Sequence, residues 1–192
     1  KNYDLLAETN RELLVCHDGN SSDDKEMAEL ISCDKFYYQK GDNLGDKMYN
    51  ALEEVISDSK VILLGSDIFN LDKDIIEEAF EKLETHDVVI NPSEDGGYFL
   101  IGMKKAIKEV FDLPSYGDSS VLENLIKVLE KNNLTYYLGR AALDIDIKED
   151  LLYAETGYKN IKLLGAGEYN INFTFDEDKM KKVLRLNMKS QM

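Results

Sequence analysis

Residues 60–103, KVILLGSDIFNLDKDIIEEAFEKLETHDVVINPSEDGGYFLIGM, decide the fold of this chain. Two apolar runs, residues 61–64 and 88–90, each end in a polar stretch that contains glycine. Between them, residues 71–83 carry apolar side chains at helical spacing, and Asp72 stands where a helix cap is expected. This pattern predicts a strand, a helix and a second strand, joined as a crossover unit of a parallel sheet.

Acidic side chains follow both predicted strands. Asp67 comes after the first strand, in Gly-Ser-Asp, and Asp95 comes after the second, in Asp-Gly-Gly. In open α/β sheets, ligands bind beyond the carboxyl ends of the strands. We therefore expect the active crevice at this edge of the sheet.

The rest of the chain continues the alternation and then departs from it. Further strands are predicted at residues 13–16, 36–39, 98–102 and 134–138, and further helices at residues 23–31, 46–56, 104–111 and 120–131, the last capped by Ser119. This order indicates an α/β domain. From residue 158 onward three short strands are predicted without helices between them, so we place a domain boundary there, with units at 1–157 and 158–192.

The composition excludes several classes of protein. Acidic residues outnumber Lys and Arg by 38 to 23 in the 192 residues, a formal net charge of −15 that repels nucleic acid and attracts divalent cations. No apolar run is long enough to span a membrane. Two cysteines, Cys16 and Cys33, are too few for a disulfide framework, which favours a reducing, cytoplasmic location.

Three aspartates are candidate ligands of a metal ion. Asp67 at a strand end is a suitable oxygen ligand for Mg²⁺ or Mn²⁺, and the alternative is a cap of the following helix. Asp144 and Asp146 share one face of an extended segment and could complete the site, or could form a solvated acidic turn.

Two glycine-bearing loops are candidate ligand contacts. Residues 95–97 permit a tight turn with positive φ, and the alternative is a plain hairpin turn. Residues 41–45 could present backbone N–H groups to an anion, although they lack the Lys-Ser/Thr of a P-loop.

Four motifs in a fixed order resemble one bacterial family. They are QxGDxLGxxM at residues 39–48, LLGSDI at 63–68, HDVVIxPxxDGGYxLIG at 86–102 and DIDxxEDL at 144–151. The family is the glycosyltransferase-A-fold family of nucleotide-diphospho-sugar transferases, which includes proteins named as arsenosugar-biosynthesis glycosyltransferases. The resemblance implies a Rossmann-like, mostly parallel sheet flanked by helices, a nucleotide at the strand ends and a divalent metal, Mg²⁺ or Mn²⁺.

The same resemblance assigns roles to matching positions. Asp67 and Asp146 would hold the metal, with Asp67 and Asp95 as the catalytic acids. The residues that would contact the nucleotide, the sugar or the acceptor are Gly41, Asp42, Leu44, Gly45, Ser66, Gly96 and Gly97.

The sequence departs from the family at three places. The family opens with a strand and a basic, glycine-containing loop that binds nucleotide phosphates, and residues 1–12 do not show it, so we expect an N-terminally incomplete domain. Phe69 replaces a proline, and Ile147 replaces a threonine.

The C-terminal residues resemble another family. Residues 161–170, IKLLGAGEYN, followed by VLRL at 183–186, look like the opening hairpin of an aminoglycoside/choline-kinase-like phosphotransferase. This suggests a truncated piece of a fused kinase domain.

Three functions remain open at this stage. The favoured hypothesis is a metal-dependent glycosyltransferase that uses a nucleotide-activated sugar. The alternatives are a nucleotidyltransferase, which joins a nucleotide to a phosphorylated small molecule, and a non-catalytic nucleotide-binding domain of a kinase fusion. The oligomeric state does not follow from the sequence.

Overall fold

The structure, a computed structural model, describes Leu6, Thr9 and residues 11–57, 59–66, 68 and 71–141. Asp67, Asp144 and Asp146 lie outside the described residues, as do Phe69, Ile147 and the kinase-like segment. The elements are β1 (Leu14–His17), α2 (Asp24–Ala28), β2 (Lys35–Tyr38), α3 (Leu44–Val55), β3 (Val61–Leu64), α4 (Lys73–Lys82), β4 (Val88–Pro92), β5 (Tyr98–Met103), the 3₁₀ turn η1 (Lys108–Val110), α5 (Val121–Lys131) and β6 (Tyr136–Leu138).

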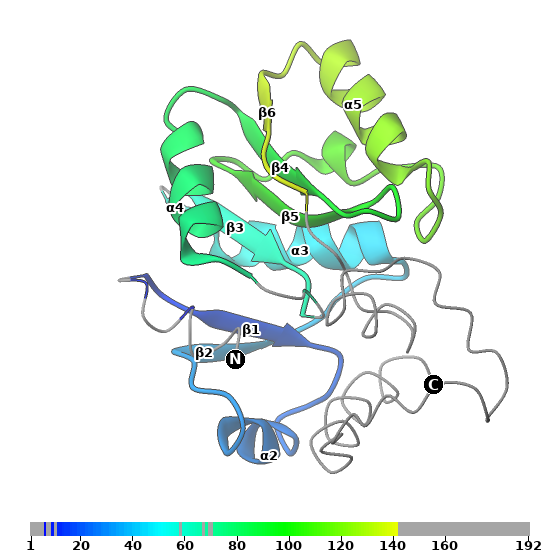
Figure 1. Cartoon of the computed structure of the whole chain (residues 1–192). Coiled ribbons are helices and arrows are strands. Elements are labelled where there is room, and N and C mark those ends of the chain that lie inside the picture. The colour runs from blue at the N-terminus through cyan, green and yellow to red at the C-terminus, as the bar shows by residue number, and fades with distance from the viewer. Residues whose placement is uncertain are drawn as a thin grey trace, which may run out of the picture.

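The strands form two sheets (Figure 1). β1 pairs with β2 in parallel, and the larger sheet has the order β3-β5-β4-β6. Within it β5 runs antiparallel to both neighbours, and β4 pairs with β6 in parallel. Three of its four strands point the same way, while two of its three pairings are antiparallel, so the sheet is mixed. The predicted α/β class is confirmed.

The prediction that β3 and β4 form a crossover unit of a parallel sheet is wrong in one respect. The two strands point the same way with α4 between them in sequence, but they do not pair, because β5 lies between them. A short turn joins β4 to β5, and a connection of that length permits only antiparallel neighbours.

Helices cover both faces of the larger sheet. There is one apolar core on each face, and successive β4 side chains point into opposite cores. Val88 and Ile90 pack with Leu52 of α3 and with α5, whereas Val89 packs on α4. Figure 1 shows α4 apart from α3 and α5. This three-layer arrangement leaves the strand ends as the place where loops meet.

Two helix starts are set by local capping. The Asp72 carboxylate accepts a hydrogen bond from the Asp74 backbone at 2.9 Å, which confirms its predicted role as the cap of α4. At the start of α3, the Asn43 side chain accepts from the Asp46 backbone at 2.9 Å and donates to the Asp46 carboxylate at 2.7 Å.

The predictions for residues 104–120 are wrong in two respects. Instead of a helix over 104–111, only the 3₁₀ turn η1 forms, since Ile107 has extended backbone. Ser119 does not cap α5. The Asp118 carboxylate instead fixes the turn before α5, because it accepts hydrogen bonds from the Ser120 backbone and hydroxyl at 2.8 and 2.5 Å.

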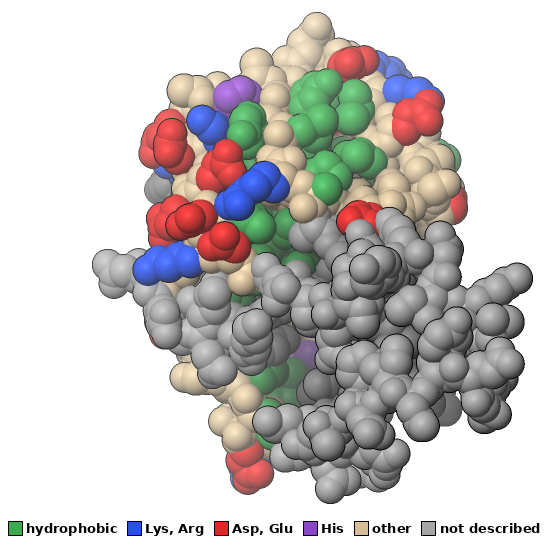
Figure 2. Space-filling view, viewed as in Figure 1, with side chains coloured by type: hydrophobic (Ala, Val, Ile, Leu, Met, Phe, Trp, Pro, Cys, Tyr) green, Lys and Arg blue, Asp and Glu red, His purple; other side chains and the backbone are tan. Residues whose placement is uncertain are grey.

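Two arginines lie close to carboxylates on the outer surface of α4 and offset part of their negative charge. Arg140 lies 3.8 Å from the Asp72 carboxylate and 3.9 Å from that of Glu78, and Arg11 lies 2.7 Å from Glu77. Figure 2 shows acidic and basic side chains interleaved on this part of the molecule. No helix within the described ranges has the length and apolar character needed to cross a membrane.

Candidate functional site

The carboxyl ends of β3 and β4 lie on either side of the start of β5. Leu64 at the end of β3 pairs with Leu100, and Pro92 at the end of β4 pairs with Tyr98. Exposed Ser66 therefore lies at the same edge of the sheet as the 93–97 turn. The sequence predicted this edge as the site, although Asp67 itself lies outside the described residues.

Asp95 holds the turn that joins β4 to β5. One of its oxygens, Oδ1, accepts hydrogen bonds from the Ser93 hydroxyl at 2.5 Å and from the Gly97 backbone at 3.0 Å. The Ser93 backbone also donates to the Gly97 carbonyl at 3.1 Å. The Asp95 side chain is exposed, so it fixes the turn and still faces solvent.

Gly96 packs against the loop that precedes α5. Its φ is 94°, and a Cβ at this position would lie 2.4 Å from the Ser119 carbonyl oxygen. The Gly96 carbonyl accepts a hydrogen bond from the Leu122 backbone at 3.0 Å. The glycine is needed here for both reasons, because a side chain would be strained and would collide with backbone.

Gly45, in the first turn of α3, packs against the other end of the same loop. A Cβ on Gly45 would lie 2.2 Å from the Phe111 carbonyl oxygen and 3.0 Å from the Tyr116 ring. The Tyr116 hydroxyl donates to that same carbonyl at 2.9 Å.

The loop of residues 111–120 thus contacts both predicted ligand loops. It meets Gly45 through Phe111 and Tyr116, and it meets Gly96 through Ser119. No function is predicted for this loop from the sequence. A tyrosine followed by Gly-Asp-Ser-Ser is the signal that it offered, and that signal is shared by many surface turns.

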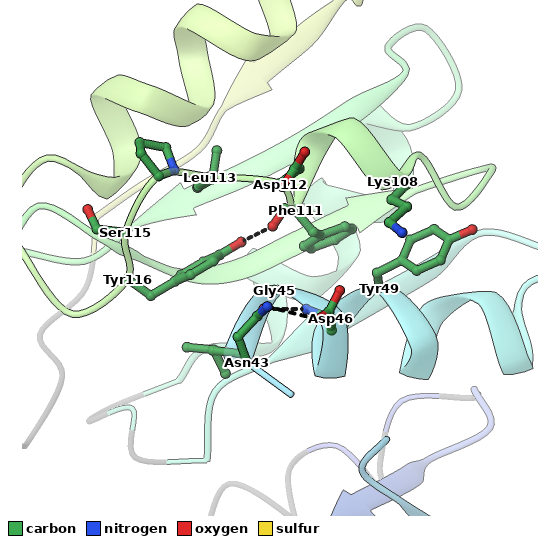
Figure 3. Close-up of a pocket in the computed structure, with 12 residues that line it drawn as sticks. Asn43, Gly45, Asp46, Tyr49, Lys108, Phe111, Asp112, Leu113, Ser115 and Tyr116 are labelled. Atoms are coloured by element: carbon green, nitrogen blue, oxygen red, sulfur yellow. Dashed lines mark hydrogen bonds between the residues drawn. The ribbon is translucent and has the colours of Figure 1, made fainter. Parts of the chain in front are cut away.

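A cavity of about 290 Å³ lies between α3 and this loop (Figure 3). It is lined by residues 43–46 and 49 of the α3 region and by residues 108 and 111–116. Two predicted nucleotide contacts, Leu44 and Gly45, therefore line a cavity, whereas Gly41 and Asp42 are not among its lining residues. A Cβ on Gly41 would lie 2.5 Å from that of Asp46, so this glycine serves the close packing of the loop on α3.

Most of the residues that form this site lie in a part of the chain that matches a known protein family. Residues 3–118 match the family of uncharacterized proteins conserved in bacteria, DUF2064. The chain belongs to the DUF2064 family. The match contains both glycine loops and most of the 111–120 loop.

Two similar proteins are named 2-phospho-L-lactate guanylyltransferase. The protein from Methanocaldococcus sp. (strain FS406-22) is 32% identical over 136 residues, which cover 67% of this DUF2064 chain and 58% of the relative. The protein from Methanocaldococcus jannaschii is 33% identical over 116 residues, which cover 59% of this chain and 50% of the relative. The chain thus spans between half and three fifths of the length of these relatives.

The DUF2064 chain also resembles a solved structure. A protein from Desulfovibrio desulfuricans G20, described as a candidate nucleotide-diphospho-sugar transferase, superposes with a TM-score of 0.74 at 27% identity. The superposition covers 84% of this chain and 73% of the other. This confirms the fold that the sequence motifs implied. Neither the kinase-like tail nor the boundary at residue 158 is tested by these comparisons.

Two tyrosines join α3, β5 and the 111–120 loop of this DUF2064 chain. The Tyr98 hydroxyl donates to the Met48 sulfur at 3.6 Å, and the Tyr116 hydroxyl donates to the Phe111 carbonyl at 2.9 Å. Burial raises the pKa of Tyr98, and burial together with the Asp112 and Asp46 carboxylates raises the pKa of Tyr116 to about 12.

The raised pKa of Tyr116 predicts a loss of stability in alkali. A tyrosine ionises near pH 10 in the unfolded chain, so between about pH 10 and 12 the unfolded state loses this proton while the folded state keeps it. The free energy of unfolding should therefore fall with rising pH in this window. Urea unfolding at stepped pH should show a shallower fall for Tyr116→Phe than for the unchanged chain, and equal slopes would contradict the assignment.

A His-Asp-Tyr cluster lies at the ends of β1 and β2. The His17 ring faces the Asp24 carboxylate through Nε2 at 3.0 Å and accepts from the Gly19 backbone through Nδ1 at 3.2 Å. The Tyr38 hydroxyl donates to the other Asp24 oxygen at 2.7 Å. Both imidazole nitrogens are therefore engaged, and the cluster fastens α2 to the strand ends.

The described residues do not form a metal site by themselves. Within these ranges there is no group of three or more His, Cys, Asp or Glu side chains able to hold a metal ion. The predicted ligands Asp67 and Asp146 lie outside the described residues. The Mg²⁺ or Mn²⁺ site thus stays a prediction.

Proposed function

We propose that this chain contains the nucleotide-binding part of a nucleotidyltransferase, which joins a nucleotide to a phosphorylated small acid. The proposal rests on one surface at the carboxyl edge of the sheet, in which three segments contact one another. We call this surface the connected wall. There the 111–120 loop contacts the start of α3 on one side and the β4–β5 turn on the other. A nucleotide bound at α3 and an acceptor bound at the turn would then share one rigid wall.

The similar proteins favour nucleotidyl transfer over the glycosyl transfer that the motifs first suggested. The two relatives named as guanylyltransferases are 32% and 33% identical to the chain. In nucleotidyl transfer, a phosphate oxygen of the acceptor attacks the α-phosphorus of a nucleoside triphosphate. The new P–O bond forms as the bond between the α-phosphorus and the bridging oxygen to the β-phosphorus breaks, and pyrophosphate leaves with the electron pair.

The predicted site residues take these roles in the proposal. Leu44 and Gly45, with Gly41 and Asp42 supporting their loop, border the nucleotide, and Ser66 lies at the same strand-end edge. The turn of residues 95–97 borders the acceptor, with Asp95 as a catalytic residue that faces it.

Asp67 and Asp146 are the proposed ligands of Mg²⁺ or Mn²⁺. Such an ion, when bound, would neutralise the leaving pyrophosphate. Adding Mn²⁺ with a nucleotide should broaden the NMR signals of Ser66 and Ile68, which flank Asp67 in sequence. Broadening confined to other acidic segments would contradict this assignment.

Product analysis separates nucleotidyl transfer from glycosyl transfer. The protein would be incubated with each nucleoside triphosphate and a panel of phosphorylated two- and three-carbon acids, and separately with nucleotide-sugars and the same acceptors. Pyrophosphate release together with a nucleotide-linked acid would support the proposal. Release of a nucleoside diphosphate from a nucleotide-sugar, without pyrophosphate in the first reaction, would instead favour the glycosyltransferase, which the solved structure supports by its description.

A further inference from the structure

The two walls of the cavity shown in Figure 3, α3 on one side and η1 with the 111–120 loop on the other, carry side chains of opposite charge. Asp46 comes from the first turn of α3, and Lys108 comes from η1. Figure 3 shows the Asp46 carboxylate and the Lys108 amine reaching toward the space between the two elements. Lys108 is exposed and forms no ion pair with any described residue, and Asp46 bonds Asn43 through one oxygen only.

The same cavity has aromatic walls. Tyr49 and Tyr116, both half-buried, line it from α3 and from the 111–120 loop. Aromatic side chains stack on nucleobases with little preference for which base they hold. The volume of about 290 Å³ is at the lower limit of small-molecule sites, and it is large enough for a nucleobase.

We propose that this cavity binds the nucleobase and selects guanine, an inference that rests on the proposed function. Guanine carries two acceptors, O6 and N7, next to the donors N1–H and N2–H₂. An ammonium group only donates and a carboxylate only accepts, so Lys108 binds the acceptor side and Asp46 the donor side. Adenine has an amino group in place of O6, which directs a donor at the Lys108 ammonium.

Charge also decides which part of the nucleotide enters. Asp112 also lines the cavity, and the Asp112 and Asp46 carboxylates both raise the pKa of Tyr116. Two negative side chains and one positive side chain disfavour a phosphate group here. The phosphates then lie toward the strand ends, on the side of Ser66 and the 93–97 turn.

The test is nucleotide preference in variants of Lys108. The whole chain would be titrated by calorimetry with GMP, AMP, CMP and UMP, probes that need no turnover. The unchanged chain is expected to prefer GMP. Lys108→Gln should reduce the ratio of GMP to AMP affinity about tenfold, the loss of one specific base contact. Lys108→Glu should reverse the preference toward AMP, because a carboxylate accepts from the adenine amino group.

Lys105→Gln is the matched control, because Lys105 is exposed, carries the same charge and is not among the cavity residues. It should leave the ratio of GMP to AMP affinity unchanged. A GMP preference that persists in both Lys108 variants, or equal affinity for all four nucleotides in the unchanged chain, would overturn the base assignment alone. If no nucleotide binds, the proposed function fails with it.

Discussion

Replacing Gly96 by alanine is expected to lower the free energy of unfolding by about 2–5 kcal/mol, the sum of backbone strain and overpacking. Strain arises because alanine rarely adopts the φ of 94° found here. Overpacking arises because the new methyl group would lie 2.4 Å from the Ser119 carbonyl oxygen. The measurement is the urea unfolding midpoint and slope of the purified variant.

Gly117→Ala is the matched control for this prediction. Gly117 also has positive φ, 85°, but a Cβ there would meet nothing within 4 Å. Its replacement should therefore cost only the strain, about 1–2 kcal/mol. If the two variants were equally stable, the contact between the β4–β5 turn and the 111–120 loop would not contribute to the free energy of unfolding. That result would contradict the close packing of these two segments at the site.

Replacing Gly45 by alanine is expected both to destabilise the chain and to weaken nucleotide binding. In a helix this change ordinarily stabilises by roughly 0.5–1 kcal/mol. Here the methyl group would lie 2.2 Å from the Phe111 carbonyl oxygen, so overpacking of about 1–3 kcal/mol reverses the sign. The 111–120 loop must then move away from α3, which changes the shape of the cavity.

Two measurements on Gly45→Ala test this expectation. Urea unfolding should show a net loss of stability, and calorimetry with a nucleoside triphosphate should show affinity lower by about tenfold, equivalent to roughly 1.4 kcal/mol. A variant that is more stable than the unchanged chain would show that the loop does not pack on Gly45. Normal affinity in a destabilised variant would place the nucleotide elsewhere.

Local sequence signals predicted most elements of the fold. The bounds of β3 agree with the apolar run at 61–64, and the side chain of Asp72 caps α4 as predicted. These features depend on neighbours in sequence, so a pattern of residues determines them. The position of β5 between β3 and β4 depends on pairing at a distance, and its apolar run is compatible with either strand direction.

The candidate site was predictable only in part, for a related reason. Glycine signals that something approaches the backbone closely, but it does not say whether that neighbour is a ligand or protein. At Gly96 and Gly41 the structure shows protein neighbours, Ser119 and Asp46. Lys108 and Tyr116 were missed because they enter the cavity from a segment predicted as a helix and a plain loop.

The nucleotide is expected to bind between the start of α3 and the 111–120 loop, and NMR titration with GTP tests this location. Assigned backbone amide signals of the chain would be followed as GTP is added. The predicted result is a set of shifts at the start of α3 (residues 43–49), at the β4–β5 turn (residues 93–97) and at residues 108–120, which contact both. Shifts confined to β1, α2 and β2, or to the outer face of α4, would show that the nucleotide binds elsewhere.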